Sequence, residues 1–69
     1  MGDPRLVSSL KEARTAAGLT QAELAERAGV SRKTINTVEN GVFIPSTVLA
    51  LSLARALGTT VEGLFRLAE

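Results

Sequence analysis

A chain of 69 residues is long enough for one small domain with its own hydrophobic core and too short for a second one. The absence of cysteine and histidine excludes a disulfide framework and the usual zinc sites, so that we expect neither a metal nor another cofactor. A net charge of +1 is well below the basic excess that marks many nucleic-acid-binding proteins, and any such site must depend on where single cations lie. No apolar run approaches the roughly 18 residues that a membrane span requires, and we expect a cytoplasmic protein.

The periodic segments are rich in alanine and leucine and the strand signals are weak, which together predict an all-α fold. The first helix is predicted over Leu6 to Ala17, and Gly18 follows it as a C-cap. Thr20 and Glu23 have the spacing of a capping box, in which each side chain accepts a hydrogen bond from the other residue's backbone N–H. A second helix is therefore predicted to begin at Gln21.

A sharp turn separates this second helix from a third. Gly29 tolerates a positive φ, and Ser31 is a typical N-cap. The third helix is predicted over residues 32–40, with Ile35 and Val38 facing inward. Its other face is polar and follows the i, i+3, i+4, i+7 rule, through Lys33, Asn36, Thr37 and Asn40. Residues 20–40 thus form two capped helices around a short turn, with a polar stripe on the second that suits a DNA groove.

The C-terminal part is predicted to contain two further helices. Ser46 is a plausible N-cap for a helix that ends at Leu57, and Thr60 for a last helix from Val61 to Leu67. Spacing places the inward face of the fourth helix at Leu49, Ala50, Leu53, Ala54 and Leu57.

The fourth helix carries more apolar residues than its inward face needs. Val48 and Leu51 fall on a neighbouring face, and Phe43 and Ile44 precede the helix. Together with Phe65 they could form a patch large enough to be buried in a dimer. Val48, Leu51 and Phe65 are therefore the candidates for a dimer interface.

The residues of an active site are missing from the sequence. There is no cysteine nucleophile, no histidine base, no phosphate-cradling glycine loop and no set of metal ligands. Paired acids such as Glu23 and Glu26 are more typical of a solvated helix face. We expect that the protein is not an enzyme.

Several segments together resemble the Cro/C1-type (XRE) helix-turn-helix family, which includes the DNA-binding domains of phage repressors and many bacterial regulators. The matching segments are Gly18 to Ala25, Gly29 to Ser31, Ile35 to Gly41, Pro45 to Ser46 and Leu53 to Gly58. The resemblance implies a compact, lambda-repressor-like domain of five helices over residues 1–69, with the helix-turn-helix at about residues 20–40. It also implies a bacterial or archaeal protein associated with the nucleoid.

By this resemblance the third helix is the recognition helix, which lies in the major groove of double-stranded DNA. The residues expected to read base edges are Arg32, Lys33, Asn36 and Thr37. Arg32 or Lys33 could donate to guanine, Asn36 could pair with adenine, and the Thr37 methyl group could touch thymine.

The family also implies contacts to the DNA backbone and one internal ion pair. Gln21 at the start of the second helix, Ser31 and Asn40 are the expected phosphate-binding residues. Arg14 and Glu39 occupy the positions of a partly buried ion pair that ties the first helix to the end of the third.

Two departures from the family pattern stand out. Val42, Phe43 and Ile44 follow the Asn-Gly pair, where the family often carries a lysine or arginine that meets a phosphate. Gly63 stands where an acid commonly closes a capping box on the fifth helix.

These features predict a transcriptional regulator, in the commonest case a repressor, that binds an inverted-repeat operator as a homodimer. The alternative is a protein-interaction module, such as an antitoxin or a factor that bridges to a polymerase. The operator, the target genes, any effector and the direction of regulation stay open. So does the question whether the chain is a whole protein or part of a larger regulator with a further domain or partner.

Overall fold

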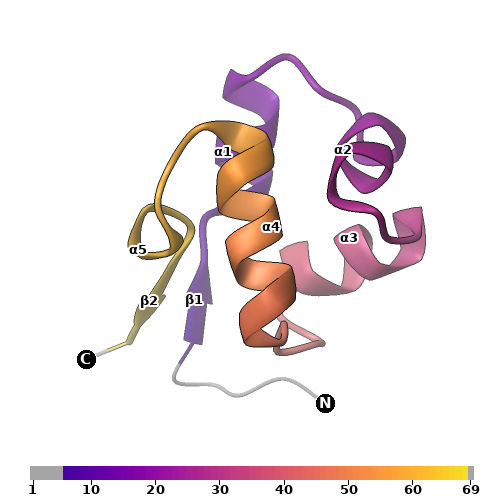
Figure 1. Ribbon diagram of the computed structural model, residues 1–69. Helices are drawn as coiled ribbons and strands as arrows, with labels where there is room; N and C mark the ends of the chain where they lie inside the picture. The colour runs from indigo at the N-terminus through magenta and orange to yellow at the C-terminus, as the bar shows by residue number, and fades with distance from the viewer. Residues whose placement is uncertain (1–5, 69) are drawn as a thin grey trace.

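The computed structural model describes residues 6–68, and the outermost residues of the predicted domain, 1–5 and 69, lie outside this range. Helices make up most of the described chain, and the two short strands lie side by side next to α5 (Figure 1). The helices are α1 (Leu10–Ala16), α2 (Gln21–Ala28), α3 (Arg32–Glu39), α4 (Thr47–Leu57) and α5 (Val61–Leu64), and the strands are β1 (Leu6–Ser8) and β2 (Phe65–Leu67).

Side-chain caps begin α2, α3, α4 and α5 at the residues that the sequence predicts. The Thr20 hydroxyl accepts the Glu23 N–H at 3.0 Å, and the Glu23 carboxylate accepts the Thr20 N–H at 2.8 Å, which completes the capping box of α2. The hydroxyls of Ser31, Ser46 and Thr60 cap α3, α4 and α5 in the same way. Gly29 ends α2 with a φ of 74°, a conformation that strains any residue with a Cβ atom.

The core lies where α2, α3 and α4 meet, and α2 packs against both of the other two helices. The inward faces predicted from spacing for α3 and α4 are buried, except that Leu57 is only half-buried. The buried residues are Leu10, Leu24, Ala25, Ile35, Val38, Leu49, Ala50, Leu53, Ala54, Leu64 and Phe65. Burying one face of α3 in this way leaves its opposite face toward solvent.

The structure corrects the prediction for the two ends of the chain. The expected helix from Leu6 begins only at Leu10, and the expected helix to Leu67 ends at Leu64. The residues beyond them pair as antiparallel strands, with Leu6 opposite Leu67 and Ser8 opposite Phe65. The Ser9 N–H extends this pairing with a bond of 2.7 Å to the Leu64 carbonyl oxygen. Pairing between the two ends therefore outweighs helix propensity, and the fold remains a five-helix domain with a small added sheet.

Packing around Thr59 explains the glycine at position 63. A Cβ atom on Gly63 would lie 2.6 Å from the Thr59 hydroxyl oxygen, so a side chain there would force the threonine to move. The Thr60 hydroxyl still accepts the Gly63 N–H at 3.0 Å. The short helix α5 thus keeps its cap although its capping box is incomplete.

Within residues 6–68, none of the helices combines the length and the apolar character that crossing a membrane would demand.

Candidate nucleic-acid interface

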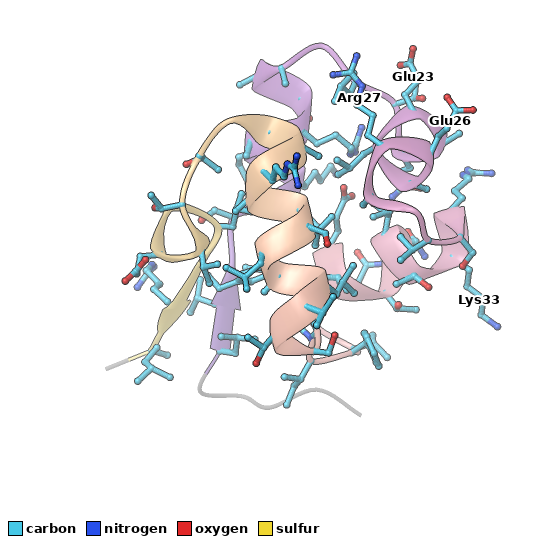
Figure 2. All side chains as sticks on the ribbon, in the orientation of Figure 1. Glu23, Glu26, Arg27 and Lys33 are labelled. Atoms are coloured by element: carbon cyan, nitrogen blue, oxygen red, sulfur yellow. The ribbon has the colours of Figure 1, made fainter. Side chains whose placement is uncertain are left out.

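Helix α3 presents a polar face to solvent because its apolar face is anchored in the core. Ile35 and Val38 are buried, whereas Arg32, Lys33 and Asn36 are exposed. Figure 2 shows the Lys33 side chain extending away from the body of the protein. Three of the four expected base-reading residues are therefore accessible on one helix.

Thr37 differs from the other three because it is half-buried. Its hydroxyl donates to the Thr34 carbonyl oxygen at 3.0 Å. Its own carbonyl oxygen accepts the N–H groups of Val42 and Phe43, at 3.0 and 3.3 Å. Thr37 thus links α3 to the chain that follows it, and its hydroxyl hydrogen is already used inside the helix.

A surface hollow lies between α3 and the start of α2. Gln21, Arg32, Lys33 and Asn36 line it, and a neighbouring hollow continues past Thr20 along the start of α2. In the view of Figure 2, Glu23 and Glu26 extend from the upper part of α2, whereas Lys33 extends downward from the start of α3. The cations of α3 therefore stand beside a concave surface at a helix N-terminus, where the helix dipole also favours anions.

Side-chain amides connect the residues expected to bind bases with those expected to bind phosphates. Gln21 Nε2 donates to Glu39 Oε1 at 3.0 Å and to Asn36 Oδ1 at 3.2 Å. Asn40 Nδ2 donates to the same Asn36 oxygen at 3.3 Å. Sequence reasoning missed this network: the i, i+4 spacing of Asn36 and Asn40 is a usable signal, but nothing local brings Gln21 to them.

An ion pair lies behind this network. Arg14 Nε donates to Glu39 Oε2 at 2.6 Å, and Arg14 Nη2 donates to Glu39 Oε1 at 3.3 Å. Arg14 Nη1 also donates to the Leu19 carbonyl oxygen at 2.8 Å. The hydrogen bond to Glu39 raises the pKa of Arg14 above its usual value. The structure thus contains the ion pair that the family pattern implies, with the Glu39 side chain only 2% exposed.

Ser31 stands at the beginning of α3 and is exposed. Its hydroxyl oxygen accepts the Thr34 N–H at 3.2 Å and lies 3.0 Å from the Thr34 hydroxyl. Capping the helix is therefore its role in the free protein, and any contact with a phosphate would be shared with that role.

Apolar side chains are exposed on a second surface, away from the inward face of α4. Val48 is 75% exposed and Leu51 57% exposed, and the connector residues Phe43 and Ile44 are exposed as well. The prediction that Phe65 belongs to this exposed patch is wrong, because Phe65 is 8% exposed and lies in the core. We call the exposed set of Phe43, Ile44, Val48 and Leu51 the α4 apolar patch.

Acidic side chains in residues 6–68 do not gather into a group of three or more that could hold a metal ion.

Comparison with known proteins identifies the family to which this chain belongs. The sequence model of the helix-turn-helix family matches residues 10–64. An HTH-type transcriptional regulator of Methanothermobacter thermautotrophicus is 51% identical over 61 residues, which are 87% of this chain and 88% of the relative. The HTH-type transcriptional regulator YgzD of Bacillus subtilis is 37% identical over 62 residues, which are 90% of this chain and 94% of the relative.

A solved structure agrees with these relatives. The restriction-modification controller protein C.AhdI of Aeromonas hydrophila is 42% identical, with a TM-score of 0.74, over 77% of this chain and 80% of the controller protein. The chain belongs to the Cro/C1-type helix-turn-helix family of DNA-binding transcription regulators. This family is not a class of enzymes, and the comparisons do not favour the protein-interaction alternative.

Proposed function

We propose that the protein is a repressor that binds an inverted-repeat operator as a homodimer, with α3 of each copy in the major groove. The observation that carries this proposal is the division of α3 into two faces, one buried in the core and one exposed with Arg32, Lys33 and Asn36. A major groove admits one α-helix, and such side chains reach base edges there.

Base reading falls to the exposed face of α3. Arg32 and Lys33 carry donors that suit the O6 and N7 atoms of guanine. Asn36 lies beside them in the hollow, and the Thr37 methyl group suits contact with thymine. These four residues are the proposed determinants of the operator sequence.

Backbone binding falls to helix ends near α3. Gln21 begins α2, whose first N–H groups and dipole attract a phosphate, and Ser31 begins α3. Asn40 lies at the other end of α3. Contacts of this kind position the protein on DNA without selecting a sequence.

The α4 apolar patch is the proposed dimer interface, now without Phe65. Residues 41–54 contain no charged side chain, so two copies of the patch can face each other without like-charge repulsion. The patch begins at Phe43, shortly after α3 ends at Glu39, so a symmetric dimer through it would hold the two recognition helices at a fixed separation. Two helices about 34 Å apart would read half-sites one turn of DNA apart.

Repression follows from occupancy in this proposal. A dimer on promoter DNA covers groove and backbone that other proteins need, inside the cytoplasm where the DNA lies. No catalytic step is required of the chain.

Selection of bound sequences from a random pool of double-stranded DNA tests the proposal. The expected result is an enriched inverted repeat whose half-sites are about one turn apart. A transcription assay on a promoter that carries this repeat should then show less transcript with protein than without it. Enrichment of no sequence would contradict DNA recognition, and enrichment of a single half-site would contradict the symmetric dimer.

A further inference from the structure

The carboxylate of Glu39 determines which way the neighbouring amides point. In its ion pair with Arg14 this carboxylate has acceptor atoms only. The amide atom of Gln21 that lies 3.0 Å from Glu39 Oε1 must therefore be the nitrogen, because an oxygen there would face another acceptor.

The direction continues from Gln21 to Asn36. The same Gln21 nitrogen lies 3.2 Å from the side chain of Asn36, and an amide nitrogen can only donate. Asn36 must turn its oxygen toward it. Asn40 Nδ2 also donates to Asn36 Oδ1, at 3.3 Å. Both lone pairs of Asn36 Oδ1 are therefore used inside the protein.

Only the nitrogen of Asn36 then remains for a ligand. It belongs to an exposed residue at the hollow that Arg32 and Lys33 also line. Pairing with adenine in the major groove needs both amide atoms, the oxygen for the 6-amino group and the nitrogen for N7. The expected pairing of Asn36 with adenine is therefore incompatible with this network.

We propose that Asn36 reads DNA as a hydrogen-bond donor only, and that its partner in the operator is an acceptor, namely purine N7, guanine O6 or thymine O4. Glu39 is a positioning residue in this arrangement, since it sets the orientation of Asn36 through Gln21. The inference rests on the proposed function, because it assigns a role within the same recognition surface.

The test uses base analogues in the selected operator. One set of duplexes lacks single acceptors, through 7-deazapurines, 2-aminopurine for guanine, or a thymine analogue without O4. A second set lacks single 6-amino groups, through purine in place of adenine. The dissociation constant of each duplex is measured with the wild-type protein and with Asn36→Ala.

We expect one acceptor to be coupled to Asn36. Its removal should weaken binding of the wild-type protein about three- to tenfold, as for one hydrogen bond, and should not weaken Asn36→Ala further. Removal of any 6-amino group should affect the two proteins equally.

Asn36→Asp gives a second, independent readout. Its carboxylate can still accept from Gln21 and Asn40, so the network stays satisfied, but its other oxygen now presents an acceptor to DNA. A repeated selection should move the preference at the contacted position to cytosine or adenine, which offer amino donors. Thermal unfolding followed by circular dichroism controls for the fold of both variants.

Coupling of Asn36→Ala to a 6-amino group would overturn the inference, and so would the absence of coupling to any base atom. Both results presuppose a selected operator, so sequence-specific DNA binding by the protein stands in either case. If the wild-type protein enriches no DNA sequence in the selection, that result contradicts the proposed function and leaves no operator on which to test Asn36.

Discussion

Glu39 joins three helices at a single carboxylate. It closes α3, pairs with Arg14 of α1 and accepts a hydrogen bond from Gln21 of α2. Because its side chain is almost fully buried, removing either charge of the pair strands the other away from water. The residue therefore matters for folding before it matters for DNA.

Glu39→Ala should lower the free energy of unfolding by roughly 3–5 kcal/mol, because Arg14 keeps a charge without its partner. Urea unfolding followed by circular dichroism measures the loss. Glu62→Ala removes an exposed acid and should change stability by less than about 0.5 kcal/mol. The double variant Arg14→Met, Glu39→Leu should be more stable than Glu39→Ala, since no unpaired charge remains. A Glu39→Ala protein as stable as the wild type would contradict the structural role of Glu39.

Arg32→Ala should weaken operator binding by roughly 1–3 kcal/mol and relax the preference at one base pair, because a base-edge contact is lost. Fluorescence anisotropy on the operator and on its single-base variants measures both effects. Arg55→Ala is the matched control: it removes the same exposed charge from the far end of α4. Equal losses in the two variants would mean that Arg32 contributes only a general charge.

At the scale of the element, the beginning of α2 depends on an ionised side chain. The Thr20 N–H donates to the Glu23 carboxylate, and this backbone hydrogen bond is the main cause that lowers the pKa of Glu23, aided by the Thr20 side chain and the charge of Arg27. A carboxyl group whose pKa is lower in the folded state than in the unfolded state stabilises the fold. This contribution is fully present at a pH above 4.5, the ordinary pKa of the group. The contribution disappears as the pH falls through the folded pKa.

Glu23→Gln should therefore be less stable than the wild type at neutral pH, and the difference should shrink as the pH falls below about 4.5. Glutamine keeps an acceptor for the capping box but does not titrate. Urea unfolding of both proteins between pH 3 and pH 7 measures the difference. A difference that is constant over this range would show that the charge of Glu23 does not matter to the cap.

The elements also show where sequence reasoning succeeds. The starts of α2, α3 and α4 are predicted to the residue because each depends on a local bond, such as that from the Leu49 N–H to the Ser46 hydroxyl. The predicted start of the first helix and the predicted end of the last helix are wrong. Leu6 to Ser8 and Phe65 to Leu67 form strands that pair with each other, and the two segments are far apart in the sequence. Strands of three residues are too short to leave a periodic pattern.

At the scale of the whole molecule, a net charge of +1 does not prevent strong DNA binding if cations are displaced toward one face. A dimer that neutralises about six phosphates should lose roughly a thousandfold in affinity between 50 and 200 mM salt. Anisotropy titrations across this range give the slope. An affinity that does not change with salt would contradict phosphate binding.

Dimerisation depends on the α4 apolar patch in our proposal. Leu51→Glu should place two charges in the interface, produce a monomer in sedimentation equilibrium and weaken operator binding. Ala16→Glu adds the same charge at an exposed position of α1 and should remain a dimer. A dimeric Leu51→Glu protein would exclude this patch as the interface.

The caps, the turn at Gly29 and the inward faces of the central helices can be predicted from the sequence alone, because they depend on neighbours within about four residues. Which distant groups meet depends on the tertiary packing. Leu6 to Ser8 pair with Phe65 to Leu67 as strands, and Phe65 is buried in the core. Gln21 of α2 contacts Asn36 and Glu39 of α3. The physical reason is that contact between remote segments follows from how the whole core packs, and no local pattern records the direction of a hydrogen bond across that distance.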